Sequence, residues 1–169
     1  MMAVHEAGHV LGAWLTGGTV ERVVLHPLAI SRTDLAVNPH PVLVSWAGPL
    51  FGALLPVLCW LIWRSASVRS AHVVRWFAGF CAVANGAYLG IGSLTGDGDA
   101  GDLLREGAAI WQLVVFGVFA LAAGLWLWHG LGRSFRESMA ATEHPWRTTT
   151  LAVAALTVVM IVEFAVGAG

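Results

Sequence analysis

The sequence has 169 residues, of which 57% are hydrophobic and 11% are charged, and its formal net charge is −1. Soluble domains carry about a quarter charged residues, so this composition excludes an ordinary soluble domain and predicts an integral membrane protein. The length predicts a single domain, residues 1–169, and the near-neutral charge gives no reason to expect nucleic acid as a partner.

The first expected helix, residues 1–16, carries the pentapeptide His5-Glu6-Ala7-Gly8-His9, an H-E-x-x-H pattern. On a helix, His5 and His9 project from one face and can bind the same metal ion. Two imidazoles and a carboxylate suit Zn²⁺, which keeps a position for water and lowers the pKa of that water. Glu6 lies beside the metal and is expected to act as general base. The ordinary alternative is a pair of interfacial histidines with a solvated glutamate.

The remaining elements follow as one polar connection and four apolar segments. Residues 19–41 are polar, and their first ten residues predict a short strand or hairpin. Residues 42–63, 76–94, 110–131 and 149–169 are each long and apolar enough to span a membrane. We therefore expect an all-α, polytopic membrane helix bundle with about four to five transmembrane helices and a short extended or β-like connection after the first helix. Small residues in the 42–63 segment allow another helix, or an extended peptide, to approach closely.

A catalytic zinc site needs a third protein ligand. Asp97, Asp99 and Asp102 lie in a glycine-rich stretch after the 76–94 segment. Such a stretch can unwind and return a carboxylate to the bundle where protein encloses it. The alternative is a solvated turn, with Asp102 in the first turn of the next helix. We expect at least one of the three aspartates to reach the metal.

Several motifs in order resemble the site-2 protease family of intramembrane zinc metalloproteases, over roughly residues 1–105. They are the H-E-x-x-H pentapeptide, Gly17-Gly18, Ala47-Gly48-Pro49, and an asparagine-bearing span that leads into an Asp-Gly segment. The resemblance implies hydrolysis of peptide bonds within or beside the membrane, with residues 1–105 as the core and residues 106–169 as additional helices.

The resemblance also implies roles for single residues. His5 and His9 match the family's zinc ligands, and Glu6 matches its catalytic residue. Asp99 best fits the glycine and leucine spacing of the family's third ligand, and Asp97 is the second choice. Asn85 corresponds to an asparagine that contacts substrate in the family, although it lies farther upstream than usual.

The depth of the metal site in the membrane and the orientation of the chain conflict with the family's arrangement. If the first helix begins at Met1, His5 lies at its entry side, whereas Asp99 lies past the far end of the 76–94 span. This difference predicts several more apolar residues before Met1. The positive-inside rule puts one set of connections in the cytoplasm, those with Arg64, Arg69, Arg75, Arg133, Arg136 and Arg147. The connection with Asp99 then lies on the opposite side of the membrane, whereas the family's metal site lies nearer the cytoplasmic side. The orientation stays open.

The expected cofactor is Zn²⁺, and the expected partners are the lipid bilayer and a membrane-protein or peptide substrate. We expect a multi-pass protein, with the bacterial cytoplasmic membrane as the favoured location. Two other functions remain open: a catalytically inactive relative that binds a membrane protein, and an ion-transport component in which the aspartates and Glu163 line a polar path. The sequence does not indicate the oligomeric state.

Overall fold

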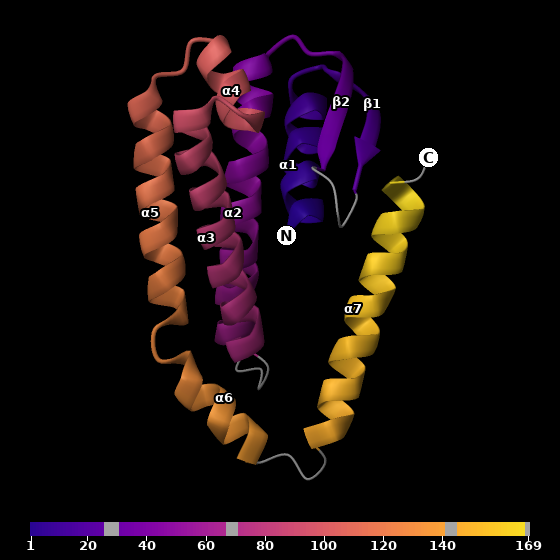
Figure 1. The fold of residues 1–169 in the computed structure, drawn as a ribbon, viewed down its shortest axis with the longest axis vertical. Coiled ribbons are helices and arrows are strands. Elements are labelled where there is room, and N and C mark those ends of the chain that lie inside the picture. Colours follow the sequence, from indigo (N-terminus) through magenta and orange to yellow (C-terminus); the bar gives the residue numbers. More distant parts are fainter. Residues whose placement is uncertain (26–30, 67–70, 141–144, 168–169) are drawn as a thin grey trace.

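The computed structural model describes residues 1–25, 31–66, 71–140 and 145–167 (Figure 1). The described residues form a helical structure with one two-stranded antiparallel sheet, which confirms the expected fold class. In chain order the elements are α1 (Met2–Leu15), β1 (Thr19–Val24), β2 (Arg32–Val37), α2 (Pro41–Ser65), α3 (Ala71–Thr95), α4 (Gly98–Arg105), α5 (Ile110–Trp128), α6 (Leu131–Ala140) and α7 (Pro145–Gly167).

Helices α2, α3 and α5 form the bundle, with α3 packed against both of the others (Figure 1). Helices α2 and α3 have 25 residues each, hence a length of roughly 37 Å, and a bilayer core is about 30 Å thick. In the described chain, three stretches are long and apolar enough to cross a membrane: α2, α3 and residues 110–140. The first and fifth expected spans also form helices, but their apolar parts are shorter, with 14 residues in α1 and residues 149–165 in α7.

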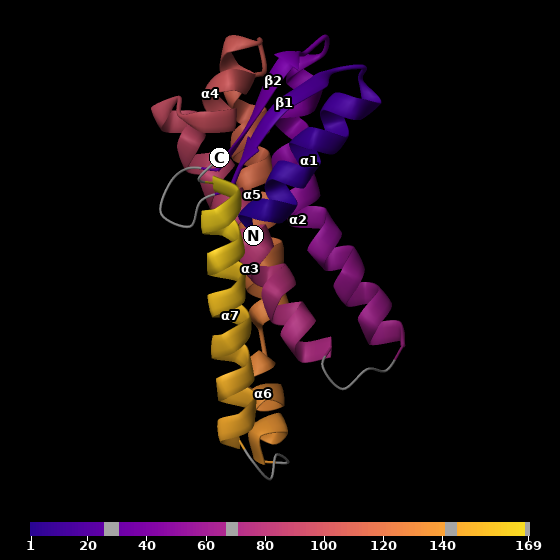
Figure 2. The same cartoon turned by 90° about the vertical axis from the view of Figure 1, so that its right-hand side faces the viewer.

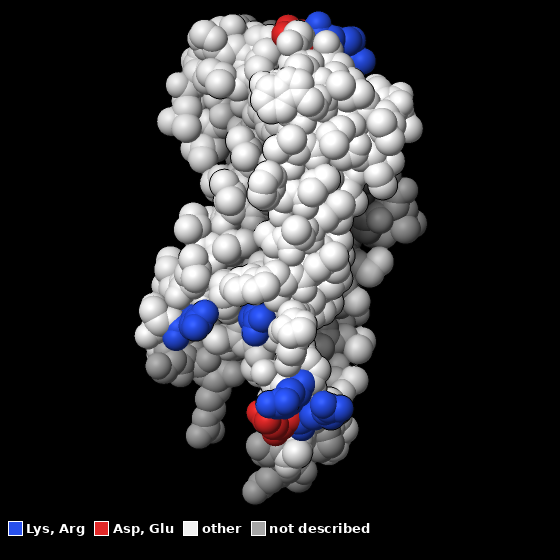
Figure 3. Space-filling model, turned by 90° about the vertical axis from the view of Figure 1, so that its left-hand side faces the viewer, with Lys and Arg blue, Asp and Glu red and all other residues white. Residues whose placement is uncertain are grey.

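The surface of the bundle matches a lipid environment. Large apolar side chains such as Leu54, Ile91 and Phe119 are exposed along the helices. Figure 3 shows one face on which charged side chains occur only near the two ends, with a wide uncharged zone between them. Exposure of a wide apolar surface is unfavourable in water and favourable in the hydrocarbon core of a bilayer. The chain is therefore an integral membrane protein.

Helix α1 lies obliquely across one end of α2 and is followed by the β1–β2 hairpin (Figure 2). The hairpin pairs Val20 with Leu35 and Arg22 with Asp34. Strand β1 confirms a strand in residues 19–28, and β2 lies beyond that stretch; residues 26–28 of the prediction lie outside the described residues. Helix α1 is only about 21 Å long, so it covers part of α2, and Met1 lies part-way along the bundle rather than at its end (Figure 1). His5 and Asp99 are therefore in contact, without the difference in depth that we expected for a first span that begins at Met1.

After α3 the chain turns back over the bundle as the short helix α4. Gly96 and Gly98 adopt positive φ angles of 74° and 56°, which glycine tolerates without steric cost, and these residues make the turn. Ala100 and Leu103 of α4 are fully buried against Leu89 of α3. The aspartate segment is thus a packed helix rather than the unwound stretch we expected, because its apolar face completes the core.

Candidate metal centre

Helix α1 places its two histidines and its glutamate inside the protein. His5, Glu6 and His9 are 4%, 2% and 7% exposed, although they lie in the first half of a short helix. The two imidazole rings lie one turn apart, with centroids at 4.9 Å and their Nε2 atoms at 3.1 Å. The alternative of interfacial histidines with a solvated glutamate therefore does not describe these side chains.

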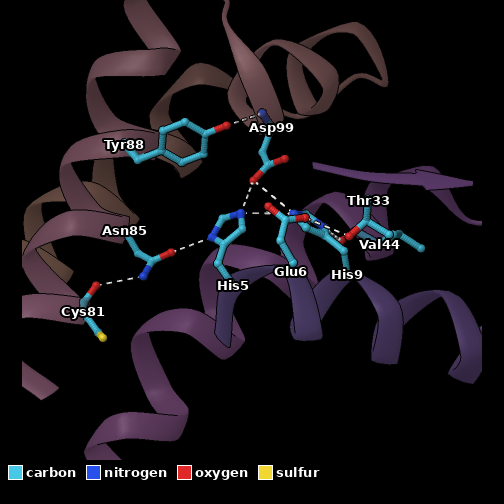
Figure 4. Close-up of polar contacts among 9 residues, drawn as sticks. All are labelled: His5, Glu6, His9, Thr33, Val44, Cys81, Asn85, Tyr88 and Asp99. Carbon is cyan, nitrogen blue, oxygen red and sulfur yellow. Dashed lines mark hydrogen bonds and ion pairs between the residues drawn. The ribbon is translucent and has the colours of Figure 1, made fainter. Parts of the chain in front are cut away.

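Asp99 of α4, the aspartate that the resemblance favoured, lies beside the two histidines. Its Oδ2 atom lies 2.8 Å from His5 Nε2 and 3.3 Å from His9 Nε2 (Figure 4). One ligand atom from each of the three residues lies within 4.8 Å of the other two. Burial raises the pKa of the Asp99 carboxyl, but the adjacent His5 and His9 rings lower it by more, to about 2. The carboxylate is therefore ionised at neutral pH, as a metal ligand must be.

The other two aspartates do not join this group, although Asp102 lines the same cavity. Asp97 is the residue before α4, and its backbone carbonyl accepts a hydrogen bond from the Gly101 amide. Asp102 points to Arg105 one turn later and forms an exposed ion pair with it. Among the described residues, only Asp99 joins the two histidines in a group that can hold a metal.

The Nδ1 atom of each histidine forms a hydrogen bond on the side of the ring away from the ligand group. His5 Nδ1 lies 2.7 Å from Asn85 Oδ1, and His9 Nδ1 lies 2.8 Å from the Val44 carbonyl oxygen. Asn85 is 1% exposed and also donates from Nδ2 to the Cys81 carbonyl at 2.8 Å, which fixes the orientation of its amide. Because both partners of the rings are acceptors, each Nδ1 donates to its partner, and Nε2 of each ring is left to face Asp99 and the centre of the group.

This donor set fits a zinc ion. Two Nε2 lone pairs and one carboxylate oxygen converge at separations of 2.8 to 3.3 Å. Ligands about 2.05 Å from a tetrahedral zinc ion are separated by roughly 3.3 Å, so the group is close to the required size. One shared proton can bridge only one pair of these three close atoms, whereas a metal ion between them attracts all three atoms. Backbone or carboxylate support behind each ligating histidine is usual for zinc proteins.

Glu6 lies next to this group but outside it. Thr33 Oγ1, from strand β2, donates a hydrogen bond to Glu6 Oε2 at 2.8 Å. The two residues line a cavity of about 310 Å³, together with His5, His9 and Asp99. Ser31 and Arg32, at the start of β2, also line this cavity.

Sequence reasoning missed Tyr88, the only tyrosine of the chain. The Asp99 backbone N–H donates to its hydroxyl at 3.3 Å, and its ring meets His5 edge to face at 5.7 Å (Figure 4). A side chain at Gly98 would overlap the Tyr88 hydroxyl. Tyr88 follows Asn85 by three residues, hence on the same helix face, and this spacing was the available signal.

The glycines of α2 leave space for side chains of the neighbouring helices. A Cβ atom at Gly48 would overlap the His9 ring, and one at Gly52 would lie 2.7 Å from Asn85 Oδ1. The small residues of α2 therefore let α1 and α3 approach closely, as we expected for a neighbouring helix, and the approach of a substrate peptide stays a prediction.

The sequence model of one protein family, described as peptidase M50B-like, matches residues 1–85, which is half of the 169 residues. The chain belongs to this peptidase family. The match includes the H-E-x-x-H helix, the Ala47-Gly48-Pro49 motif and Asn85, and it confirms the resemblance to site-2 proteases at the level of the family. No curated protein and no solved structure matches the chain.

Proposed function

We propose that this peptidase M50B-like protein is an intramembrane zinc metalloendopeptidase that hydrolyses peptide bonds of membrane-protein or peptide substrates. The convergence of His5, His9 and Asp99 in a cavity that also contains Glu6 carries the proposal. These three residues would hold Zn²⁺, which supplies a Lewis acid that activates water and polarises a carbonyl group.

Glu6 is proposed as the catalytic residue that moves the proton. Thr33 occupies one carboxylate oxygen, Oε2, and this leaves Oε1 to accept a proton from the attacking water. Glu6 then returns the proton to the leaving amine nitrogen. Burial of Glu6 keeps competing water away from this transfer and strengthens the electrostatic interactions within the site.

The hairpin supports an extended substrate. Strand β2 pairs with β1 on one side only in the described sheet, and its residues Arg32, Thr33 and Leu35 line the cavity. A helical segment hides its carbonyl groups in hydrogen bonds, whereas an extended segment can pair with a free strand edge and expose a carbonyl to the site.

The two rival functions make different demands. An ion path requires a continuous line of polar groups, but His5, His9 and Asp99 converge on one point. Helix α7, which carries Glu163, stands apart from α4 in the fold (Figure 1). A catalytically inactive relative would keep the fold and bind a membrane protein, so activity has to be measured directly.

The test is cleavage of a membrane-inserted reporter substrate by purified, zinc-loaded protein, comparing the original chain with Glu6→Gln. We expect Glu6→Gln to retain zinc and to lose cleavage by a factor of about 10² to 10⁴, because general base catalysis contributes that much. Glu21→Gln, at an exposed position of β1, is the matched control and should cleave normally. Equal cleavage by Glu6→Gln would contradict the proposal, and a zinc-loaded original chain that cleaves no reporter would favour the inactive relative.

A further inference from the structure

A second cavity lies at the other end of the bundle, where α2 ends, α3 begins and α5 passes into α6. Its volume is about 300 Å³. It is lined by Trp60, Arg64, Ala71, His72, Arg75, Trp126, Leu131 and Ser134. None of the described lining residues is an aspartate or a glutamate, and the zinc-site residues are all elsewhere.

Two arginines are held beside the same indole ring in this cavity. The guanidinium carbons of Arg64 and Arg75 lie 5.6 and 5.8 Å from the centre of the buried Trp60 ring, and Arg75 also lies 6.0 Å from the Trp126 ring. Indole faces attract cations, so the rings fix the positions of both guanidinium groups. Two positive charges are therefore gathered in one place.

Among the described residues, no carboxylate forms an ion pair with either arginine. Arg75 Nη2 donates to the His129 carbonyl at 3.0 Å and to the Trp126 carbonyl at 3.4 Å, at the end of α5. The Arg75 Nε atom is buried and has no hydrogen-bond partner among the described residues. Both guanidinium groups therefore keep N–H donors that an anion could use. An anion between the two guanidinium groups would relieve their repulsion.

The position of the cavity indicates the source of the anion. Arg64 is in the last turn of the membrane-spanning α2, and Leu131 and Ser134 are in the first turn of the amphipathic helix α6. Figure 3 shows basic side chains gathered at this end, below the uncharged zone. Tryptophan, arginine and amphipathic helices are typical of the headgroup level of a bilayer, where phosphate groups are abundant.

We propose that this cavity, the Arg64–Arg75 site, binds the phosphate group of an anionic phospholipid. The two guanidinium groups contact the phosphate oxygens, and the acyl chains continue along the exposed apolar surface of α2 and α5. Because α2, α3, α5 and α6 all contribute residues, the bound lipid ties the lower ends of these helices together. This inference does not depend on peptidase activity or on zinc.

The test is titration of the full-length, detergent-purified protein with phosphatidylglycerol, followed by native mass spectrometry, with phosphatidylcholine as the neutral lipid. We expect a phosphatidylglycerol complex that phosphatidylcholine does not form at the same concentration. Arg64→Gln should weaken it about fivefold, since one basic side chain near an anionic surface contributes about that factor. Arg64 is exposed, so the substitution should leave the fold intact, and Arg64→Lys should retain most of the affinity.

Arg105→Gln is the matched control, because Arg105 is an exposed arginine on α4 with a carboxylate partner. Its affinity for phosphatidylglycerol should be unchanged. Equal weakening by Arg64→Gln and Arg105→Gln would show a general charge effect and overturn the site. Equal binding of the two lipids would overturn it as well. If inorganic phosphate at millimolar concentration displaced the lipid completely, the lipid assignment would be overturned in favour of free phosphate.

Discussion

At the residue scale, the centre depends on groups that orient the histidines as much as on the ligands themselves. His5 and His9 could be predicted from their spacing alone, because four residues on a helix bring two side chains to one face. The role of Asn85 behind His5 could not, because it requires that α3 face α1 at this level. Its two polar atoms are both used within the protein, and substrate contact by Asn85 stays a prediction.

Replacing Asn85 by Ala should weaken zinc binding. The His5 Nδ1–H would lose its acceptor in a buried place, and the ring would be free to rotate or to change tautomer. Loss of such a partner commonly reduces metal affinity by about 10- to 100-fold. A competition titration with a chelator measures the change, and Asn85→Asp, which keeps the acceptor for His5 but loses the donor to the Cys81 carbonyl, should bind zinc more tightly than Asn85→Ala. Unchanged affinity in Asn85→Ala would mean that the hydrogen bond does not orient His5.

Tyr88→Phe tests how Asp99 is positioned. The substitution removes the hydroxyl that accepts the Asp99 backbone N–H and keeps the ring that meets His5. One such hydrogen bond contributes about 1 kcal/mol, so the same titration should show zinc binding weakened by about fivefold. Tyr88→Ala also removes the ring and should cause a larger loss. If both variants bound zinc like the original chain, α4 would be held by its core contacts alone.

At the scale of the elements, the apolar segments could be predicted and the short polar helices could not. The segment expected at residues 42–63 appears as Pro41–Ser65, since about 20 apolar residues in a membrane must form a helix. Helix α4 contains two glycines, which are poor helix formers, and it is stabilised by the burial of Ala100 and Leu103. Helix α6 was expected only as a polar connection, because its sequence carries few apolar residues.

The contact between α1 and α2 yields a prediction with a matched control. Gly48→Ala adds a methyl group where the His9 ring lies, and we expect the free energy of unfolding to fall by about 1–3 kcal/mol with reduced zinc binding. Gly132→Ala adds the same group to helix α6, where nothing lies within 4 Å, and should be neutral or slightly stabilising. Thermal unfolding in detergent measures both. Equal melting temperatures for the two variants would contradict the close packing of His9 against α2.

At the scale of the whole molecule, the metal would join parts of the chain that are far apart in sequence. His5 and Asp99 are separated by 94 residues, and the site connects α1 and its hairpin to α4 and the bundle. A ligand that binds only the folded state stabilises that state, so removal of zinc by a chelator should lower the melting temperature. For zinc at 100 times its Kd the loss is about 2.7 kcal/mol, and re-added zinc should restore it. Asp99→Asn should show no response to the chelator, and an equal shift in that variant would contradict the link.

The central claim is that His5, His9 and Asp99 together bind one zinc ion, and elemental analysis of the detergent-purified protein tests it most directly. The comparison is the original chain with His5→Ala, with Asp99→Asn, and with Asp102→Asn as the control at an exposed position on the same helix. The structure predicts about one zinc per chain, lost with His5→Ala and with Asp99→Asn and kept with Asp102→Asn. No zinc in the original chain would contradict the account, as would zinc that survives Asp99→Asn and is lost with Asp102→Asn.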